Sequence, residues 1–285
     1  MGYLSPATDD PPYVFLLLHG GGQSSLSWAC AATHLKQHAN VVALDLRGHG
    51  ATHTDNDTDL STPTAVADIT AALTALYAPN PPSPMVVAGH SMGGALAIRL
   101  TAANTLPVIG CLCLDLVEGS AIASMEHIRH SVQQRPSHFP SLDTAIEWTV
   151  RSSLILNPTS ARLSVPATLT YQPTTHSYTW RTDLLASQPH WLGWFEGLTA
   201  AFLGCPQPKL LLLADVERLD REMSVAQMQG RLQVVVLRGC GHQLMEDRPV
   251  DVVRCMVEFC GRQQMARRGR MAKEGKTVGV LGIGR

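Results

Sequence analysis

Six short apolar runs, which alternate with longer segments of helical period, constrain the fold of this 285-residue chain most strongly. Runs of this length and composition are typical of strands that are buried on both faces. They occupy residues 13–18, 40–45, 85–88, 109–115, 209–214 and 232–237. Because buried strands that alternate with helices are typical of a parallel sheet, we predict an α/β fold with a mostly parallel sheet flanked by helices.

The clearest helical segment lies between the second and third predicted strands. Ser61 or Thr62 can cap its N-terminus, and Pro63 suits the first turn of a helix. Its apolar residues recur at steps of three and four: Val66, Ile69, Leu73 and Leu76. A second helix is predicted from Met92 to about Ala103.

Residues 118–204 break this alternation of strands and helices. They contain four of the five tryptophans and several prolines, but no clear strand run. We predict that they form a helical lid, inserted between two strands of a single domain that spans residues 13–262. The large aromatic residues of its second half are expected to form a core within the lid: Trp180, Trp191, Trp194 and Phe195.

Both ends of the chain lack the apolar pattern. Residues 1–12 are polar and rich in proline, so we expect an N-terminal tail with too little sequence for further strands. Residues 263–285 are rich in arginine and glycine and show no core period. A disordered basic tail is therefore expected there.

The composition excludes several classes of protein. Hydrophobic residues make up 45% of the chain and charged residues 16%, which is typical of a globular protein. The formal charge of −1 combines +6 over residues 261–285 with −7 over the rest, so nucleic acid is not expected as a partner. No stretch approaches the ~20 apolar residues of a membrane helix, and we expect no membrane segment.

The seven cysteines and the N-terminal residues bear on the cellular compartment. No C-x-x-C pair of the kind that zinc sites use is present, so most cysteines are expected to be buried free thiols. The N-terminus has neither the basic start nor the apolar core of a signal peptide. We therefore expect an intracellular location, in the cytoplasm, the nucleus or both.

The third predicted strand leads into Gly89-His90-Ser91-Met92-Gly93, which matches the G-x-S-x-G pattern of a nucleophile elbow. The setting adds weight, because an apolar strand precedes the pattern and a helix follows it. Such a turn leaves no room for side chains two positions before and after the serine, and glycine occupies both positions. We predict that Ser91 is a nucleophile, held above the N-terminal amides of the helix.

A glycine run, His19-Gly20-Gly21-Gly22, ends the first predicted strand, where hydrolases place backbone donors for a developing oxyanion. We expect the donors to be the amides of Gly21 and Met92, with Gly22 as the next choice. Neither G-x-G-x-x-G nor G-x-x-x-x-G-K-[ST] is present, which argues against a dinucleotide or phosphate loop.

His242 is the histidine best placed to act as the general base. In serine hydrolases with this kind of elbow, the catalytic histidine follows the nucleophile and the acid in the chain. Of the twelve histidines, only His242 lies just beyond a strand in the last third, within Gly239-Cys240-Gly241-His242. The flanking glycines allow this loop to bring an imidazole over the edge of the sheet.

The acid that would orient this histidine has two candidate positions. Asp115 ends the strand that comes after the elbow helix, and three further acids follow the next strand: Asp215, Glu217 and Asp220. An acid at either strand end could accept the imidazole N–H and hold the reactive tautomer. Position alone leaves both possibilities open.

The surroundings of these residues resemble the protein phosphatase methylesterase family over about residues 14–262. The most specific blocks are Asp115-Leu116-Val117-Glu118-Gly119 and Gln227-Met228-Gln229-Gly230. Other segments contribute: His19-Gly20-Gly21-Gly22-Gln23-Ser24, Gly89-His90-Ser91-Met92-Gly93-Gly94, Tyr178-Thr179-Trp180-Arg181 and Cys240-Gly241-His242. The chain departs from the family in its short, uncharged stretch at residues 169–176, where members often carry an acidic insert, and in its short N-terminus.

The resemblance implies an α/β-hydrolase fold and a triad of Ser91, Asp115 and His242, with Glu217 as the runner-up acid. It also implies a serine carboxylesterase that removes the methyl ester from the C-terminal leucine of the protein phosphatase 2A catalytic subunit through an acyl-enzyme. Neither a cofactor nor a metal is implied. The expected partner is that phosphatase subunit with its methylated C-terminal tail.

Two other functions stay open from the sequence. A small-molecule carboxylesterase or lipase of the same fold would share Ser91 and His242. A non-catalytic binding protein of the hydrolase fold would tolerate loss of the triad, yet every triad position is filled here.

Overall fold

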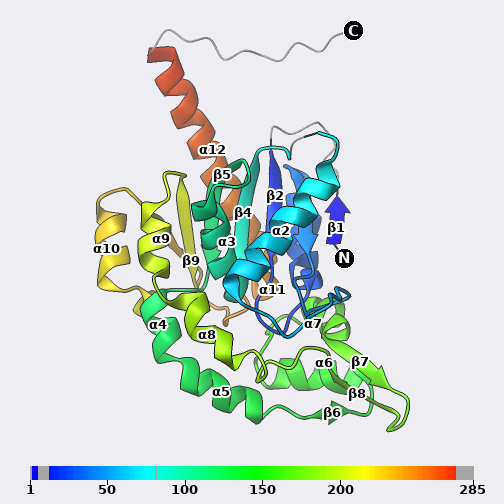
Figure 1. Cartoon of the computed structure of the whole chain (residues 1–285). Helices are drawn as coiled ribbons and strands as arrows, with labels where there is room; N and C mark the ends of the chain where they lie inside the picture. The colour runs from blue at the N-terminus through cyan, green and yellow to red at the C-terminus, as the bar shows by residue number, and fades with distance from the viewer. Residues whose placement is uncertain (1, 6–12, 81, 274–285) are drawn as a thin grey trace.

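The computed structural model describes residues 2–5, 13–80 and 82–273, and it contains a seven-stranded sheet with helices on both faces (Figure 1). The strand order is β1-β3-β2-β4-β5-β9-β10, and the pairings are parallel except for that of β1 with β3. The parallel strands are β2 (Val14–Leu18), β3 (Asn40–Leu44), β4 (Met85–His90), β5 (Val108–Leu114), β9 (Lys209–Leu213) and β10 (Gln233–Val236). The predicted α/β fold and its six strands are confirmed.

Strand β1 (Gly2–Ser5) corrects the prediction that residues 1–12 form a tail without strands. It pairs antiparallel with β3, with Gly2 opposite Leu44 and Ser5 opposite Val41. Four residues are too few to show a strand pattern in the sequence, and an edge strand needs backbone hydrogen bonds to only one neighbour. Residues 1 and 6–12 lie outside the described residues.

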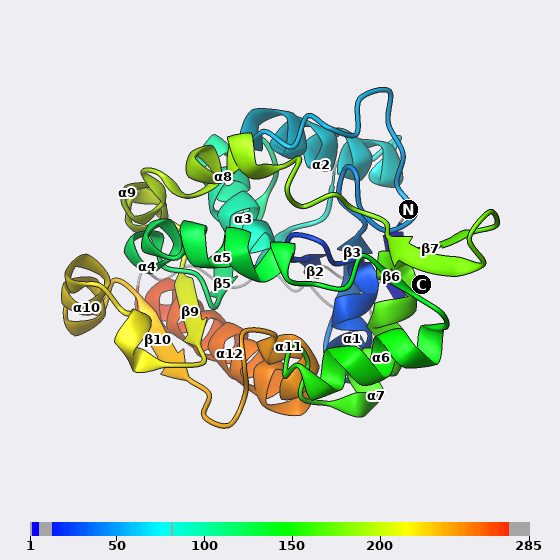
Figure 2. The same cartoon turned by 90° about the horizontal axis from the view of Figure 1, so that it is seen from below.

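Two apolar layers enclose the sheet because its strands are apolar on both sides. One face is covered by α2 (Thr62–Tyr77), α3 (Met92–Ala103), α8 (Gln188–Phe195), α9 (Leu198–Gly204) and α10 (Arg221–Met228). The other is covered by α1 (Ala29–Leu35), α11 (Leu244–Asp247) and α12 (Pro249–Lys273) (Figure 2). Along β2, Leu16 enters the first layer and Phe15 and Leu17 the second, as the alternation of side chains along a strand requires.

The lid predicted over residues 118–204 contains strands as well as helices. Its helices near the carboxyl ends of the core strands are α4 (Glu118–Ala123), α5 (Met125–Gln133), α6 (Leu142–Arg151) and α7 (Pro158–Ser164) (Figure 2). A small antiparallel sheet joins β6 (His138–Phe139), β8 (Ser177–Trp180) and β7 (Leu169–Gln172). The sequence pattern does not reveal these strands because two to four residues are too short to show a period of two.

The lid aromatics divide between two cores, which corrects the prediction of a single lid core. Trp191, Trp194 and Phe195 of α8 are buried in the layer that covers the core sheet. Trp180 instead packs against the lid's own cluster, with its ring centroid 5.5 Å from that of Phe139. The reason is topological, since α8 leaves the lid to pack against α2 and α3 before the chain enters β9.

Helix α12 continues to Lys273, past the domain end that the sequence pattern placed at residue 262. Residues 263–273 are mainly Arg, Gln, Ala, Met and Lys, which are good helix formers, so a helix can continue without a core period. Residues 274–285, the rest of the predicted basic tail, lie outside the described residues. Among the described residues, no helix combines the length and the apolarity that crossing a membrane requires.

Candidate active site

Ser91 lies at the sharp turn between β4 and α3, and its backbone is strained. Its φ of 51° and ψ of −120° fall in a region that residues with side chains rarely adopt. The Ser91 amide donates to the Leu114 carbonyl oxygen at 3.1 Å, which ties the turn to β5. The side chain is left partly exposed at the carboxyl end of the sheet.

The glycines on either side of Ser91 are required by close packing. A Cβ on Gly89 would lie 1.9 Å from the carbonyl oxygen of Gly93, and a Cβ on Gly93 would lie 2.4 Å from that of His19. Both distances are far below van der Waals contact, and the obstacles are backbone atoms that cannot rotate away. The expectation that this turn has no room for side chains at positions 89 and 93 is confirmed.

Gly89→Ala is therefore expected to lower the free energy of unfolding by about 3 kcal/mol or more, the upper end of the usual range for overpacking. Urea denaturation followed by circular dichroism measures this. Gly119→Ala is the matched control, because a Cβ there would meet no atom within 4 Å, and its stability should equal or slightly exceed that of the wild type. A Gly89→Ala variant as stable as the wild type would contradict the packing.

His242 and Asp115 form a hydrogen-bonded pair. His242 Nδ1 lies 2.7 Å from Asp115 Oδ2, so His242 carries a proton on Nδ1 and, when neutral, presents Nε2 as an acceptor. The Asp115 side chain is fully buried, whereas 41% of the His242 side chain is exposed. The loop that carries His242 is anchored by the Gly241 amide, which donates to Asp247 Oδ2 at 2.7 Å.

His90 connects this histidine to the turn that holds Ser91. Its Nε2 lies 2.8 Å from the carbonyl oxygen of His242, and the two imidazole rings pack with centroids 4.6 Å apart. Burial, assisted by the neighbouring His242, lowers the pKa of His90 to about 3, so this ring is neutral. Because His90 precedes Ser91, these contacts bring residues 91 and 242 to the same edge of the sheet.

No hydrogen bond joins the Ser91 hydroxyl to His242 within the described part of the chain. Such bonds are often long in free enzymes and shorten when substrate binds, so the missing bond does not argue against a proton transfer between the two residues.

Asp115 also forms an ion pair with an arginine, Arg218, which the sequence pattern did not single out. Arg218 Nη1 lies 2.6 Å from Oδ2, and the Ala214 amide donates to Oδ1 at 2.9 Å. Burial by itself raises the pKa of the Asp115 carboxyl, but His242, the Ala214 amide and Arg218 together outweigh burial and lower that pKa. The carboxylate is therefore charged. An arginine within the acid-rich segment after β9 is the signal that points to such a pair.

Two of the three alternative acids form hydrogen bonds with groups other than His242. Asp215 accepts from the Glu217 amide at 3.0 Å at the start of the short helix η3 (Val216–Arg218), and Asp220 caps α10. Glu217, the runner-up, is exposed and forms no hydrogen bond or ion pair with His242 in the described residues. Of the four candidates, the structure brings only Asp115 to His242.

Two buried histidines brace the glycine run after β2. His19 Nδ1 donates to the Gly20 carbonyl oxygen at 2.8 Å, and His19 Nε2 accepts from the Leu46 amide at 3.0 Å. His49 Nε2 accepts from the Gly22 amide at 2.9 Å. Burial lowers the pKa of His19 to about 3 and also lowers the pKa of His49, so both rings are neutral and can act as acceptors.

These contacts favour Gly21 over Gly22 as an oxyanion donor. The Gly22 amide is occupied by His49, and the Gly20 amide donates to Gln23 Oε1 at 2.8 Å. The amides of Gly21 and Met92 donate to no acceptor within the described residues. A Cβ on Gly21 would lie 4.0 Å from Met92 Sδ, so the two predicted donor residues are neighbours.

Gln23 links the glycine run to the segment after His242. Its Nε2 donates to Gln243 Oε1 at 2.6 Å and to Glu246 Oε2 at 3.1 Å. Glu246 is only 1% exposed, and burial raises the pKa of its carboxyl to about 8. A neutral carboxyl at pH 7 therefore supports both loops of the site.

Glu246 is expected to make stability fall as pH rises. The pKa of its carboxyl is 4.5 when unperturbed and about 8 in the folded chain, so between these values the folded state holds the proton more tightly. The stabilisation is complete below pH 4.5 and is lost by at most about 1.4 kcal/mol per pH unit up to pH 8. The glutamine of Glu246→Gln cannot ionise. In urea titrations, the free energy of unfolding of this variant, relative to that of the wild type, should therefore rise between pH 5.5 and 8.5. Parallel pH profiles would contradict the buried neutral carboxyl.

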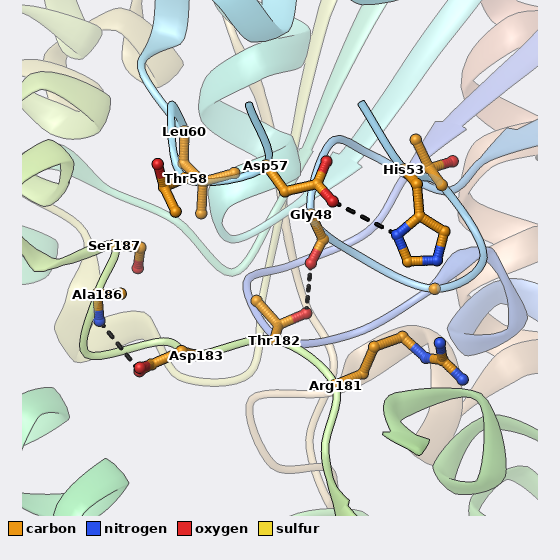
Figure 3. A pocket seen from close by; sticks show the side chains of 12 residues that line it. Gly48, His53, Asp57, Thr58, Leu60, Arg181, Thr182, Asp183, Ala186 and Ser187 are labelled. Atoms are coloured by element: carbon orange, nitrogen blue, oxygen red, sulfur yellow. Dashed lines mark hydrogen bonds and ion pairs between the residues drawn. The ribbon is translucent and has the colours of Figure 1, made fainter. Parts of the chain in front are cut away.

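Two cavities lie beside the lid. The larger, of about 220 Å³, lies between the loop after β3 and residues 181–187, where the Thr182 hydroxyl donates to the Gly48 carbonyl oxygen at 2.8 Å (Figure 3). Its lining includes none of Ser91, Asp115 and His242. The smaller, of about 50 Å³, is lined by the glycine run and by residue 243, so it adjoins the candidate site.

The described residues contain no group of three or more His, Cys, Asp or Glu side chains that could hold a metal ion. All seven cysteines are free, and five of them are buried, as expected.

Comparison with known proteins assigns the chain to a family. Residues 15–254 match the family described as "Alpha/beta hydrolase family". A Caenorhabditis elegans protein named "Probable protein phosphatase methylesterase 1" is 44% identical over 257 residues, which cover 89% of this chain and 70% of that protein. The chain belongs to the protein phosphatase methylesterase family.

Vertebrate members of the methylesterase family show similar agreement. The Mus musculus and Homo sapiens proteins named "Protein phosphatase methylesterase 1" are 39% and 38% identical over 297 positions, which cover 89% of this chain and 77% of each relative. The family resemblance in the sequence is thus confirmed. Membership in this family makes the chain a serine ester hydrolase.

Solved structures agree on the fold. E-2-(acetamidomethylene)succinate hydrolase superposes with a TM-score of 0.73 at 18% identity, covering 91% of this chain and 94% of its own. An esterase of M. tuberculosis superposes with a TM-score of 0.67 at 23% identity, covering 87% of this chain and 84% of its own. At these identities the likeness concerns the α/β-hydrolase architecture.

Proposed function

We propose that this chain removes the methyl ester from the C-terminal leucine of the protein phosphatase 2A catalytic subunit. The observation that carries the proposal is its 38–44% identity, over most of the chain, to proteins named for phosphatase methylesterase activity. The site supports it, because the strained Ser91 follows His90, whose ring packs against that of His242, and His242 is paired with the buried Asp115.

In the proposed mechanism, His242 Nε2 takes the Ser91 proton while Asp115 accepts the hydrogen bond from Nδ1–H. Ser91 Oγ attacks the ester carbonyl carbon, and the Gly21 and Met92 amides donate to the resulting oxyanion. The C–O bond to the methoxy group then breaks, and His242 returns the proton so that methanol leaves. A water molecule, deprotonated by the same imidazole, attacks the acyl-enzyme. This step frees the C-terminal carboxylate and restores the Ser91 hydroxyl.

The proposed partner is the phosphatase catalytic subunit with its methylated tail, and the test uses that protein directly. The carboxymethylated subunit is incubated with the chain or with its Ser91→Ala variant, and loss of the methyl group is followed by mass spectrometry. We expect demethylation by the wild type and none by the variant. Unchanged methylation, under conditions in which a fluorophosphonate probe labels Ser91, would reject this substrate and favour a small-molecule esterase.

A further inference from the structure

Arg135 carries an unpaired guanidinium at the edge of the smaller cavity. It follows α5 in the lid, and within the described residues its guanidinium has neither a carboxylate partner nor a hydrogen-bond acceptor. Burial lowers the pKa of Arg135, but an arginine with a lowered pKa is still charged in proteins. A partly buried charge that lacks an ion-pair or hydrogen-bond partner is unfavourable in the free protein, which makes it a candidate for ligand contact.

Trp180 fixes the position of this guanidinium. Arg135 Cζ lies 5.5 Å from the centroid of the Trp180 ring, a cation–π distance. The indole is held by its own N–H, which donates to the Pro136 carbonyl oxygen at 2.8 Å, and by Phe139 and Trp148, with ring centroids 5.5 and 6.0 Å away. Stacking uses the face of the guanidinium and leaves the N–H donors at its edge free.

The cavity beside Arg135 shares a wall with the proposed oxyanion site. Gly21 and Gly22 line it from the glycine run, and Gln243 lines it from the loop of His242. Its volume of about 50 Å³ holds roughly four water molecules at about 10–15 Å³ each, so it can take a group of a few non-hydrogen atoms. Thr149, Ser164 and Thr168 add hydroxyl groups to the lining, and Leu154 and Ile155 add apolar surface.

We propose that Arg135 is a substrate-binding residue that donates hydrogen bonds to a main-chain carbonyl of the peptide on the acyl side of the ester. This inference rests on the proposed function. The alcohol part of a methyl ester is one carbon, so recognition of the remaining substrate falls on the acyl side. With the ester carbonyl at the Gly21 amide, the peptide group attached to the leucine Cα lies about 4–6 Å away. That distance brings the cavity that Gly21 lines within reach of the peptide group, where Arg135 would select a peptide ester over a plain acyl ester.

Two methyl esters that differ only in the amide group test this assignment. N-acetyl-leucine methyl ester and methyl 4-methylpentanoate share the branched acyl skeleton, and only the first has an amide. Arg135→Met keeps an unbranched, flexible side chain and removes the charge and the hydrogen-bond donors. We expect it to lower kcat/KM for the first ester by roughly 10- to 100-fold, the usual effect of losing a charged hydrogen bond, and to change the second by less than about twofold.

Arg151→Met is the matched control, because Arg151 is an exposed lid arginine that pairs with Glu147 at 2.7 Å. It should leave kcat/KM for both esters unchanged. An equal fall for both esters with Arg135→Met, or no fall for either, would overturn the assignment. Should Arg135→Met fail to fold, Arg135→Lys keeps the charge but lacks the planar donor edge, and a smaller loss confined to the first ester is expected.

A binding measurement gives the same comparison without turnover. N-acetyl-leucinamide should slow fluorophosphonate labelling of Ser91 at lower concentrations than 4-methylpentanamide does, and Arg135→Met should remove this difference. Equal protection by both amides in the wild type would also overturn the assignment. A wild type with the Arg135-dependent preference that leaves the methylated phosphatase unchanged would reject the phosphatase substrate and keep the peptide subsite.

Discussion

Ser91→Ala is expected to lower kcat/KM for ester hydrolysis by about 10⁴- to 10⁶-fold. The variant keeps the oxyanion donors and the imidazole but has no nucleophile, so only the slow attack of water remains. Initial rates with p-nitrophenyl acetate measure the loss. The expected effect is large because Ser91, His242 and Asp115 are proposed to act as one unit, in which each member depends on the others.

The matched control is Ser137→Ala, which removes the same hydroxyl from an exposed lid position. Its rate should stay within about twofold of the wild type, and its thermal unfolding should match. A Ser91→Ala variant that retains more than about one hundredth of the wild-type rate would show that another group performs the attack.

Asp115→Asn is expected to lower kcat by about 10⁴-fold. The asparagine amide can donate to Nδ1, which favours the tautomer that carries its proton on Nε2 and cannot accept the serine proton. The measurement is kcat at pH 8 with the same ester, with stability determined in parallel because Arg218 would lose its charge partner.

Glu217→Gln separates the two acids that the sequence left open. Glu217 is exposed and forms no hydrogen bond or ion pair with the His242 imidazole in the described residues. This substitution should therefore change kcat by less than about twofold. The opposite pattern, with activity kept in Asp115→Asn and lost in Glu217→Gln, would assign the orienting role to the segment after β9.

The core strands could be predicted from the sequence because buried parallel strands are continuous apolar runs. Residues 13–18 and 209–214 show this directly, and β2 and β9 lie there. Strand β1 and the lid strands could not be predicted, since two to four residues carry no period. The position of α8 could not be predicted either. The sequence shows that Trp191 is apolar, but it does not show which layer buries this side chain.

The candidate site was predictable where its signal is local. Five consecutive residues identify the elbow around Ser91, and four identify the loop of His242. The choice of Asp115 over Glu217 by geometry depends on the contact of Asp115 with His242, which lies 127 positions away, and spacing cannot show this contact. The preference for the Gly21 amide over that of Gly22 was already expected from the sequence, and the hydrogen bond from the Gly22 amide to His49 gives its physical reason.

The most direct measurement is to map, by mass spectrometry, the residue that a fluorophosphonate probe modifies. If Ser91 is the nucleophile and His242 its base, a single adduct is expected on the peptide that contains Ser91, and His242→Ala should carry almost none after the same exposure. An adduct on another residue, or equal labelling of Ser91 in His242→Ala, would contradict a nucleophile at position 91 that is activated by the imidazole of position 242.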